Sequence, residues 1–211
     1  MLSLLVIFVI SYLLGSIPTS IIVGKLLRGI DIREHGSGNA GGTNVFRVLG
    51  WKPGVFVMVF DAFKGFVAAF WVSQIVLSPI PIEHELVQII AGLAAIIGHI
   101  WTVFAGFKGG KGVGTAAGML LALFPIALLI CLAIFAIMLF STKIVSISSI
   151  TAAVSLPIIL TIFRYVAGIE VATSLYIFGF FAAALIVFTH RSNIKRLLNG
   201  TENKFGKKKN Q

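Results

Sequence analysis

The sequence predicts an all-α integral membrane protein, and three observations support this fold class. Of the 211 residues, 58% are hydrophobic and only 11% are charged, whereas soluble domains hold roughly 45–50% apolar and 25% charged residues. The mean hydropathy is +1.03. Several uncharged stretches are long enough, at about 1.5 Å of helical rise per residue, to cross a hydrocarbon core of about 30 Å. These figures exclude a soluble globular domain, a disordered chain and a coiled coil.

The apolar stretches, in chain order, are 2–24, 54–77, 86–104, 115–140, 144–163 and 171–189. The first is too long for the apolar region of a signal peptide and no basic side chain precedes it, so we expect a span. Pro125 divides 115–140 into two short arms, Thr115–Phe124 and Ile126–Phe140. If these arms form a hairpin, the chain has seven transmembrane helices, two of them short. The alternative is five spans, with 144–163 and part of 115–140 not crossing separately.

The basic residues indicate the orientation. There are 17 Lys and Arg against seven Asp and Glu, a net charge of +10. In the seven-helix arrangement, 15 of the 17 fall on one side, in segments 25–53 and 105–114, at Lys143 and in the tail 190–211. Loop 78–85 has no Lys or Arg. Because positively charged loops stay in the cytoplasm, we expect the N-terminus outside and the C-terminus cytoplasmic. The charge therefore indicates orientation and anionic lipid rather than nucleic acid.

The cytoplasmic segment from Gly36 to Arg47 combines glycines with hydrogen-bond donors. Glycine permits positive φ and close approach, so that amide N–H groups converge on an anion, and an arginine grips phosphate bidentately. A flexible turn-rich loop carries about equal weight from composition alone. The Gly36-x-Gly38-x-x-Gly41 spacing matches a dinucleotide fingerprint, but no strand precedes it, which excludes that site. The candidate binding residues are Ser37, Asn39, Asn44 and Arg47.

A second glycine-rich segment, 106–115, carries two lysines. Glycine amides, a lysine and a helix that begins at Thr115 suit a phosphate. A nucleotide P-loop is excluded because three residues instead of four separate Gly106 from Gly110, and no Ser or Thr follows Lys111. The alternative is a tight basic turn followed by helix packing through Gly114 and Gly118. The candidate binding residues are Lys108, Gly109, Gly110, Lys111, Gly112 and Thr115.

Other polar residues lie within or beside the spans. His190 and Asn193 are three residues apart and share a helical face; His190 is a candidate base or phosphate donor, with a polar membrane anchor as the alternative. Charges inside a span are costly, so we expect Asp61 and Lys64 to pair or face a cavity. His99 is expected to hydrogen bond between helices. The basic end Lys207–Lys209 is expected to contact anionic lipid.

Together these motifs resemble the bacterial membrane acyl-phosphate:glycerol-3-phosphate acyltransferases, the PlsY family, over nearly the whole chain. The resemblance is carried by Leu14-Gly15-Ser16-Ile17-Pro18, Gly36–Arg47, Asp61 with Lys64-Gly65, Gly109–Val113, and His190, Asn193 and Arg196-Leu197. Gly114 departs from the family, which usually has alanine there. The resemblance implies one membrane-embedded domain, 1–211, in the bacterial inner (plasma) membrane, with seven helices and a cytoplasmic active site.

The resemblance also implies the reaction. An acyl group would move from acyl phosphate to the 1-hydroxyl of glycerol 3-phosphate, giving lysophosphatidic acid and phosphate for phospholipid biosynthesis, with no metal and no cofactor. Lys111, His190 and Asn193 would be catalytic. No nucleic acid and no obligatory protein partner is expected. The resemblance further implies that Ser37, Arg47 and Lys111 would hold the phosphate of glycerol 3-phosphate, and that His190 and Asn193 would orient its glycerol. The head of the acyl phosphate would be cradled by Gly109, Gly110, Gly112 and Thr115. The first loop would be shaped by Asn39 and Asn44.

The sequence shows no nucleophile–base pair, which favours direct attack without an acyl-enzyme. The competing class is a membrane transporter of phosphate or phosphate esters. Transporters usually carry inverted repeats and discontinuous helices at the bilayer midplane. No inverted repeat is visible, and the glycine segments fall at the membrane surface, so the enzyme is favoured.

Overall fold

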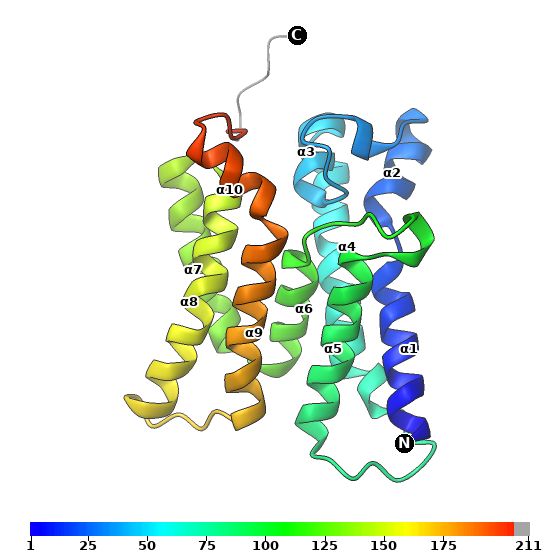
Figure 1. Cartoon of the computed structure of the whole chain (residues 1–211), viewed down its shortest axis with the longest axis vertical. Helices are drawn as coiled ribbons and strands as arrows, with labels where there is room; N and C mark the ends of the chain where they lie inside the picture. The colour runs from blue at the N-terminus through cyan, green and yellow to red at the C-terminus, as the bar shows by residue number, and fades with distance from the viewer. Residues whose placement is uncertain (205–211) are drawn as a thin grey trace. The chain divides into compact units, whose positions relative to one another are not determined.

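The structure is a computed structural model that describes residues 1–204, so the Lys207–Lys209 cluster lies outside the described residues. Within residues 1–204 the secondary structure is helical, without strands. The chain folds into two compact units, Met1–Phe124 and Pro125–Gln211 (Figure 1). The action of the chain as one functional domain stays a prediction.

The first unit consists of six helices and three short 3-10 turns. Helix α1 packs on α5, while α4 packs on α3, α5 and α6. Glycines permit the closest contacts: a Cβ at Gly15 would fall on the Ala95 backbone, and one at Gly118 on the carbonyl oxygen of Ala62. The elements are α1 (Leu2–Ser16), α2 (Thr19–Arg28), η1 (Ile32–Glu34), α3 (Gly42–Leu49), α4 (Trp51–Phe70), η2 (Val72–Gln74), α5 (His84–Ile100), η3 (Val103–Ala105) and α6 (Val113–Leu123).

The second unit consists of α7 (Pro125–Thr142), α8 (Val145–Tyr165), α9 (Thr173–Thr189) and α10 (Arg191–Leu198). Helix α8 packs against both α7 and α9. The turn between α7 and α8 passes through Lys143, whose φ of 58° lies in the left-handed region. Helices α9 and α10 meet at a bend of 59°, with His190 at the joint.

Every predicted apolar segment overlaps a helix. Five segments are long and apolar enough to cross a membrane, and α9 with α10 would be a sixth if the bent pair counts as one span. Of the two arms expected to be short, only α6 is, at 11 residues. Helix α7 reaches 18 residues, and in its last turn the hydroxyls of Ser141 and Thr142 donate to carbonyls four residues earlier. The number of crossings, seven or five, stays a prediction.

The first apolar stretch, expected as one run, is broken. Helix α1 ends at Ser16 and α2 begins at Thr19. Pro18 lies at the break, because proline has no N–H to donate and disfavours helical backbone at the residue before it. Helix α2 then continues to Arg28, beyond the predicted end of the span, and closes on Gly29 with left-handed φ of 67°.

Both glycine-rich segments lie at the same end of the first unit, opposite Met1 (Figure 1). The segments expected to be loops are partly helical: residues 42–49 form α3, and α6 begins at Val113, two residues before the predicted start. Asn44 and Arg47 therefore stand on a helix, three residues apart. The charge pattern predicts that both glycine-rich segments lie at one end of the unit, and they do (Figure 1). That this end faces the cytoplasm stays a prediction.

Candidate active site

The first glycine segment is shaped by the side chain of Asn44, which is 1% exposed. Its Oδ1 accepts the N–H of Ser37 at 2.8 Å, and its Nδ2 donates to the carbonyls of Ile32 and His35, both at 2.9 Å. A Cβ at Gly36 would collide with this amide, and the φ of Gly36 is 63°. Asn44 thus ties the segment 32–37 together through three hydrogen bonds.

Arg33 joins the two glycine segments. Its Nη1 donates to the carbonyl of Ala105 at 2.8 Å and to that of Lys108 at 3.3 Å, while its Nη2 pairs with Asp31 at 2.7 Å. The hydrogen bond from Arg33 holds the pKa of Asp31 below its usual value, although burial acts in the opposite direction. This role of Arg33 was not predicted from the sequence, because its partners are more than 70 residues away.

The second glycine segment folds back on the C-terminus of α5. The N–H of Gly109 donates to the carbonyl of Ile100 and that of Gly110 to the carbonyl of His99, both at 3.0 Å. These two amides therefore hold the loop in place instead of pointing at a ligand. Side chains at either position would strike His99. Gly112, with φ of 83°, then turns the chain into α6, and Lys111 lies just before that turn.

A buried ion cluster lies beneath this loop. Lys64 Nζ is 2.8 Å from Asp61 Oδ1, and the two residues are 1% and 4% exposed. His99 Nδ1 lies 3.5 Å from Lys64 Nζ and 3.6 Å from Asp61 Oδ1. The ion pair expected within the span and the interhelical contact expected for His99 are confirmed. Lys64 also donates to the carbonyls of Gly15 and Ile17 at the break between α1 and α2.

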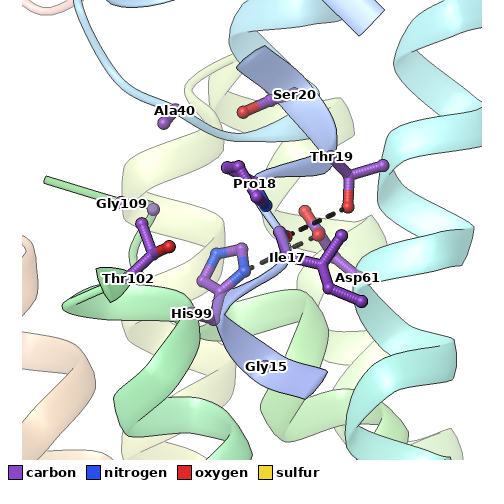
Figure 2. Close-up of a pocket in the computed structure, with 11 residues that line it drawn as sticks. Gly15, Ile17, Pro18, Thr19, Ser20, Ala40, Asp61, His99, Thr102 and Gly109 are labelled. Carbon is purple, nitrogen blue, oxygen red and sulfur yellow. Dashed lines mark hydrogen bonds and ion pairs between the residues drawn. The ribbon is translucent and has the colours of Figure 1, made fainter. Parts of the chain in front are cut away.

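These elements enclose a small, partly open pocket, shown in Figure 2. The view shows the His99 ring and the Asp61 carboxylate converging below the break at Ile17 and Pro18. Hydroxyls at its edge are already engaged: Thr102 donates to the Ser16 carbonyl, and Thr19 to that of Ile17. The lining residues are Gly15, Ile17, Pro18, Thr19, Ser20, Ala40, Asp61, His99, Thr102, Gly109 and Gly110.

Thr115 and Lys108 differ in their surroundings. Thr115 is fully buried on the first turn of α6, and its hydroxyl has no hydrogen-bond partner within residues 1–204. Lys108 is exposed, and Asn39 is half-buried near Gly41. The first unit holds most of the candidate residues, namely Ser37, Asn39, Asn44, Arg47, Lys108, Gly109, Gly110, Lys111, Gly112 and Thr115.

The second unit holds His190 and Asn193, which are 2% and 5% exposed. His190 Nδ1 lies 2.8 Å from the carbonyl of Ile186; this contact requires a proton on Nδ1, so a neutral ring carries its lone pair on Nε2. Asn193 Nδ2 donates to Glu202 Oε1 at 2.7 Å. The two residues were expected on one face of one helix. In the structure, His190 lies at the bend between α9 and α10, and Asn193 lies in α10.

Glu202 is the centre of a network in the second unit that no pattern in the sequence indicated. Besides Asn193, it accepts hydrogen bonds from Arg196 at 2.7 Å and Ser146 at 3.1 Å. Burial raises the pKa of Glu202, but the bonds from Arg196 and Asn193 outweigh it and leave the pKa below its usual value. The carboxylate therefore fixes the amide of Asn193 relative to the end of α10.

The fold and the site define a helical membrane protein with polar, anion-suited segments at one end of its first unit. A family model described as glycerol-3-phosphate acyltransferase matches residues 5–200. Glycerol-3-phosphate acyltransferases of Chlorobaculum tepidum and Chlorobium phaeobacteroides (strain BS1) are 50% and 47% identical, over 99% and 97% of this chain and 100% and 97% of theirs.

Solved structures agree with the sequence relatives. Crystal structures of PlsY, an integral membrane glycerol 3-phosphate acyltransferase, in its glycerol 3-phosphate and lysophosphatidic acid forms, are 38% identical with TM-scores of 0.82 and 0.80, covering 97% of this chain and 96% of theirs. The chain belongs to the glycerol-3-phosphate acyltransferase family and is an integral membrane acyltransferase. The resemblance inferred from the motifs is confirmed.

Proposed function

We propose that this chain transfers an acyl group from acyl phosphate to the 1-hydroxyl of glycerol 3-phosphate. The hydroxyl oxygen forms an ester bond with the acyl carbon, the bond from that carbon to the phosphate oxygen breaks, and lysophosphatidic acid and inorganic phosphate leave. The glycerol 3-phosphate and lysophosphatidic acid forms of the related PlsY structures support this acceptor and this product. Family membership favours the enzyme over the phosphate transporter.

The observation that carries the proposal is the joining of the two glycine segments by Arg33. A reaction between two phosphate-bearing substrates needs two anion sites held at a constant distance, because productive geometry depends on fractions of an ångström. Arg33 contacts the backbone of the second segment at Ala105 and Lys108. We assign the glycerol 3-phosphate phosphate to Ser37, Arg47 and Lys111, and the cradle of the acyl-phosphate head to Gly109, Gly110, Gly112 and Thr115. Lys108 is a further substrate-binding residue.

Direct transfer without an acyl-enzyme is part of the proposal. In the pocket, Thr19 and Thr102 donate to main-chain carbonyls and not to His99, so these hydroxyls lack the base that a nucleophile needs. Phosphate is a good leaving group from a mixed anhydride, and positioning with charge stabilisation is then sufficient. The two open routes for the hydroxyl proton are an oxygen of substrate phosphate and His190.

The proposed location is the bacterial inner membrane, with the chain crossing several times and the active site on the cytoplasmic side. The N-terminus is outside, and 25–53, 105–114 and 190–211 are cytoplasmic. Membrane lipid supplies the surroundings, and neither nucleic acid nor a protein partner takes part. The clustering of both glycine segments at one end of the first unit supports this orientation (Figure 1).

The test uses purified protein in detergent or lipid, supplied with palmitoyl phosphate and glycerol 3-phosphate. Phosphate released one-for-one with lysophosphatidic acid, and lost in Arg47→Ala, supports the proposal. His190→Ala then separates the two proton routes: near-full activity excludes histidine as the obligatory base. If a folded sample does not turn over palmitoyl phosphate, the acyl-phosphate donor is refuted. Turnover with acyl-CoA in its place would show that the donor is a thioester.

A further inference from the structure

The N-terminus of α2 opens onto the pocket in the first unit. Pro18 precedes this ten-residue helix, and Thr19 and Ser20 are its first two residues. The first N–H groups of a helix have no acceptor within it and carry the positive end of its dipole. In α2, the N–H of Thr19 donates to the Ile17 carbonyl, and those of Ile21 and Ile22 to the Pro18 carbonyl. Of the first four N–H groups, that of Ser20 is left without a main-chain acceptor within residues 1–204.

The side chain of Ser20 adds a second donor at the same point. Ser20 is 2% exposed and lines the pocket, and no hydrogen bond of its hydroxyl to the rest of residues 1–204 is present. Figure 2 shows the hydroxyl directed towards Ala40, on the first glycine segment. An unpaired N–H and an unpaired O–H on one residue at a helix N-terminus are the donors that an oxyanion takes.

Several acceptors around the pocket are already paired. Lys64 donates to the carbonyls of Gly15 and Ile17 and neutralises Asp61 at 2.8 Å. Thr102 donates to the Ser16 carbonyl. The negative ends of the broken helix and the one carboxylate in the lining are therefore each matched by a donor or a cation. An anion at Ser20 meets donors without meeting an uncompensated negative charge.

The opposite wall comes from the loop already assigned to the acyl-phosphate head. Gly109 and Gly110 line the pocket, and their own N–H groups are engaged with Ile100 and His99. Their role is to leave room, because a Cβ at Gly110 would collide with His99 Nε2 and lie 3.0 Å from the Ala40 carbonyl oxygen. The loop shapes the space, and the donors come from α2.

We propose that this pocket is a phosphate subsite and that Ser20 is its binding residue. The subsite holds the phosphoryl group of the acyl donor before transfer and inorganic phosphate after it. This inference rests on the proposed function, since it places the leaving group of that reaction. It adds a residue from the first span to a site otherwise built from the glycine segments, and it separates the donor phosphate from the acceptor phosphate held by Ser37, Arg47 and Lys111.

The test compares Ser20→Ala with Ser11→Ala. Ser11 is the control, because it is a buried serine like Ser20 and its hydroxyl in α1 has no partner within residues 1–204, but it does not line the pocket. Inorganic phosphate is titrated onto the purified protein by ³¹P nuclear magnetic resonance with glycerol 3-phosphate saturating, so that the acceptor's phosphate site is filled. The KM values for palmitoyl phosphate and glycerol 3-phosphate are measured in parallel. Ser20→Cys provides a second variant of similar size if the alanine variant does not fold.

Loss of one hydrogen bond to a charged ligand weakens binding about tenfold or more. We expect Ser20→Ala to weaken phosphate binding and raise the KM for palmitoyl phosphate by that factor, with the KM for glycerol 3-phosphate unchanged and Ser11→Ala like wild type. Unchanged phosphate affinity in a folded Ser20→Ala overturns the subsite. A rise in the KM for glycerol 3-phosphate alone overturns its assignment to the donor. If wild type binds phosphate in a Ser20-dependent manner but does not use palmitoyl phosphate, the proposed donor fails and the phosphate subsite stands.

Discussion

Replacing Lys64 by methionine removes the cation from the buried cluster in α4. At 2.8 Å from Asp61, the gross attraction between unit charges is about 6 kcal/mol for an effective dielectric constant of about 20. Most of this offsets the desolvation of the two ions, and removal of one partner from a buried pair costs about 3–5 kcal/mol because the other charge is left uncompensated. We therefore expect Lys64→Met to lower the free energy of unfolding by about 3–5 kcal/mol.

The double variant Asp61→Asn/Lys64→Met tests the reason for this loss. It removes the uncompensated charge and leaves the carbonyl of Gly15 without its donor, at a cost of about 1–3 kcal/mol. The carbonyl of Ile17 keeps the N–H and the hydroxyl of Thr19. The double variant should thus be more stable than Lys64→Met alone. Lys52→Met is the matched control, because Lys52 is exposed in the first turn of the same helix and surface changes usually stay within about 0.5 kcal/mol.

The assay is reversible unfolding in mixed micelles, in which the fraction of denaturing detergent is raised and helicity and tryptophan fluorescence are followed together. A Lys64→Met protein within about 1 kcal/mol of wild type would show that the pair adds nothing net, as some buried pairs do. A double variant that is less stable than Lys64→Met would refute the charge explanation and indicate packing as the cause.

Three further predictions concern the loops, the tail and the topology. Asn44→Ala should lower the free energy of unfolding by about 1–3 kcal/mol, because the N–H of Ser37 loses its acceptor and the carbonyls of Ile32 and His35 each lose one of their donors. It should also raise the KM for glycerol 3-phosphate, and unfolding and initial rates measure the two effects. The lowered pKa of Glu202 stabilises the folded state at pH values above 4.5, the usual pKa of a glutamate, and this contribution is lost as the pH falls through the lowered pKa. The difference in unfolding free energy between wild type and Glu202→Gln should therefore shrink as the pH is lowered. In a Cys131→Ser background, an impermeant thiol reagent added outside spheroplasts should label Glu170→Cys but not Lys143→Cys, whereas equal labelling of both would contradict the seven-helix arrangement.

The helices and most of the polar positions could be predicted from the sequence, but several details of the site could not. Within the segment 36–47, the sequence did not show that α3 begins at Gly42 or that Asn44 bonds to the residues before it. The glycines at 109 and 110 were expected to offer their amides to a phosphate, yet both amides bind the end of α5. Ser20 was absent from the candidate residues, because a serine inside an apolar stretch carries no signal until the break at Pro18 exposes the start of a helix. Proline at 18 was the available signal for that break.

The sequence by itself determined the class of the protein, its helical segments, which loops are basic, and the family. Hydropathy, charge and motif spacing are local properties, and the membrane converts them directly into helices because backbone groups in lipid must be paired within the segment. The tertiary structure decided which groups meet. Arg33 bonds to residues 72 and 75 positions away, Thr102 to a carbonyl 86 positions away, and Lys64 to the carbonyls of the broken first span. Such partners are chosen by the packing of helices, and a packing of this kind leaves no pattern along the chain.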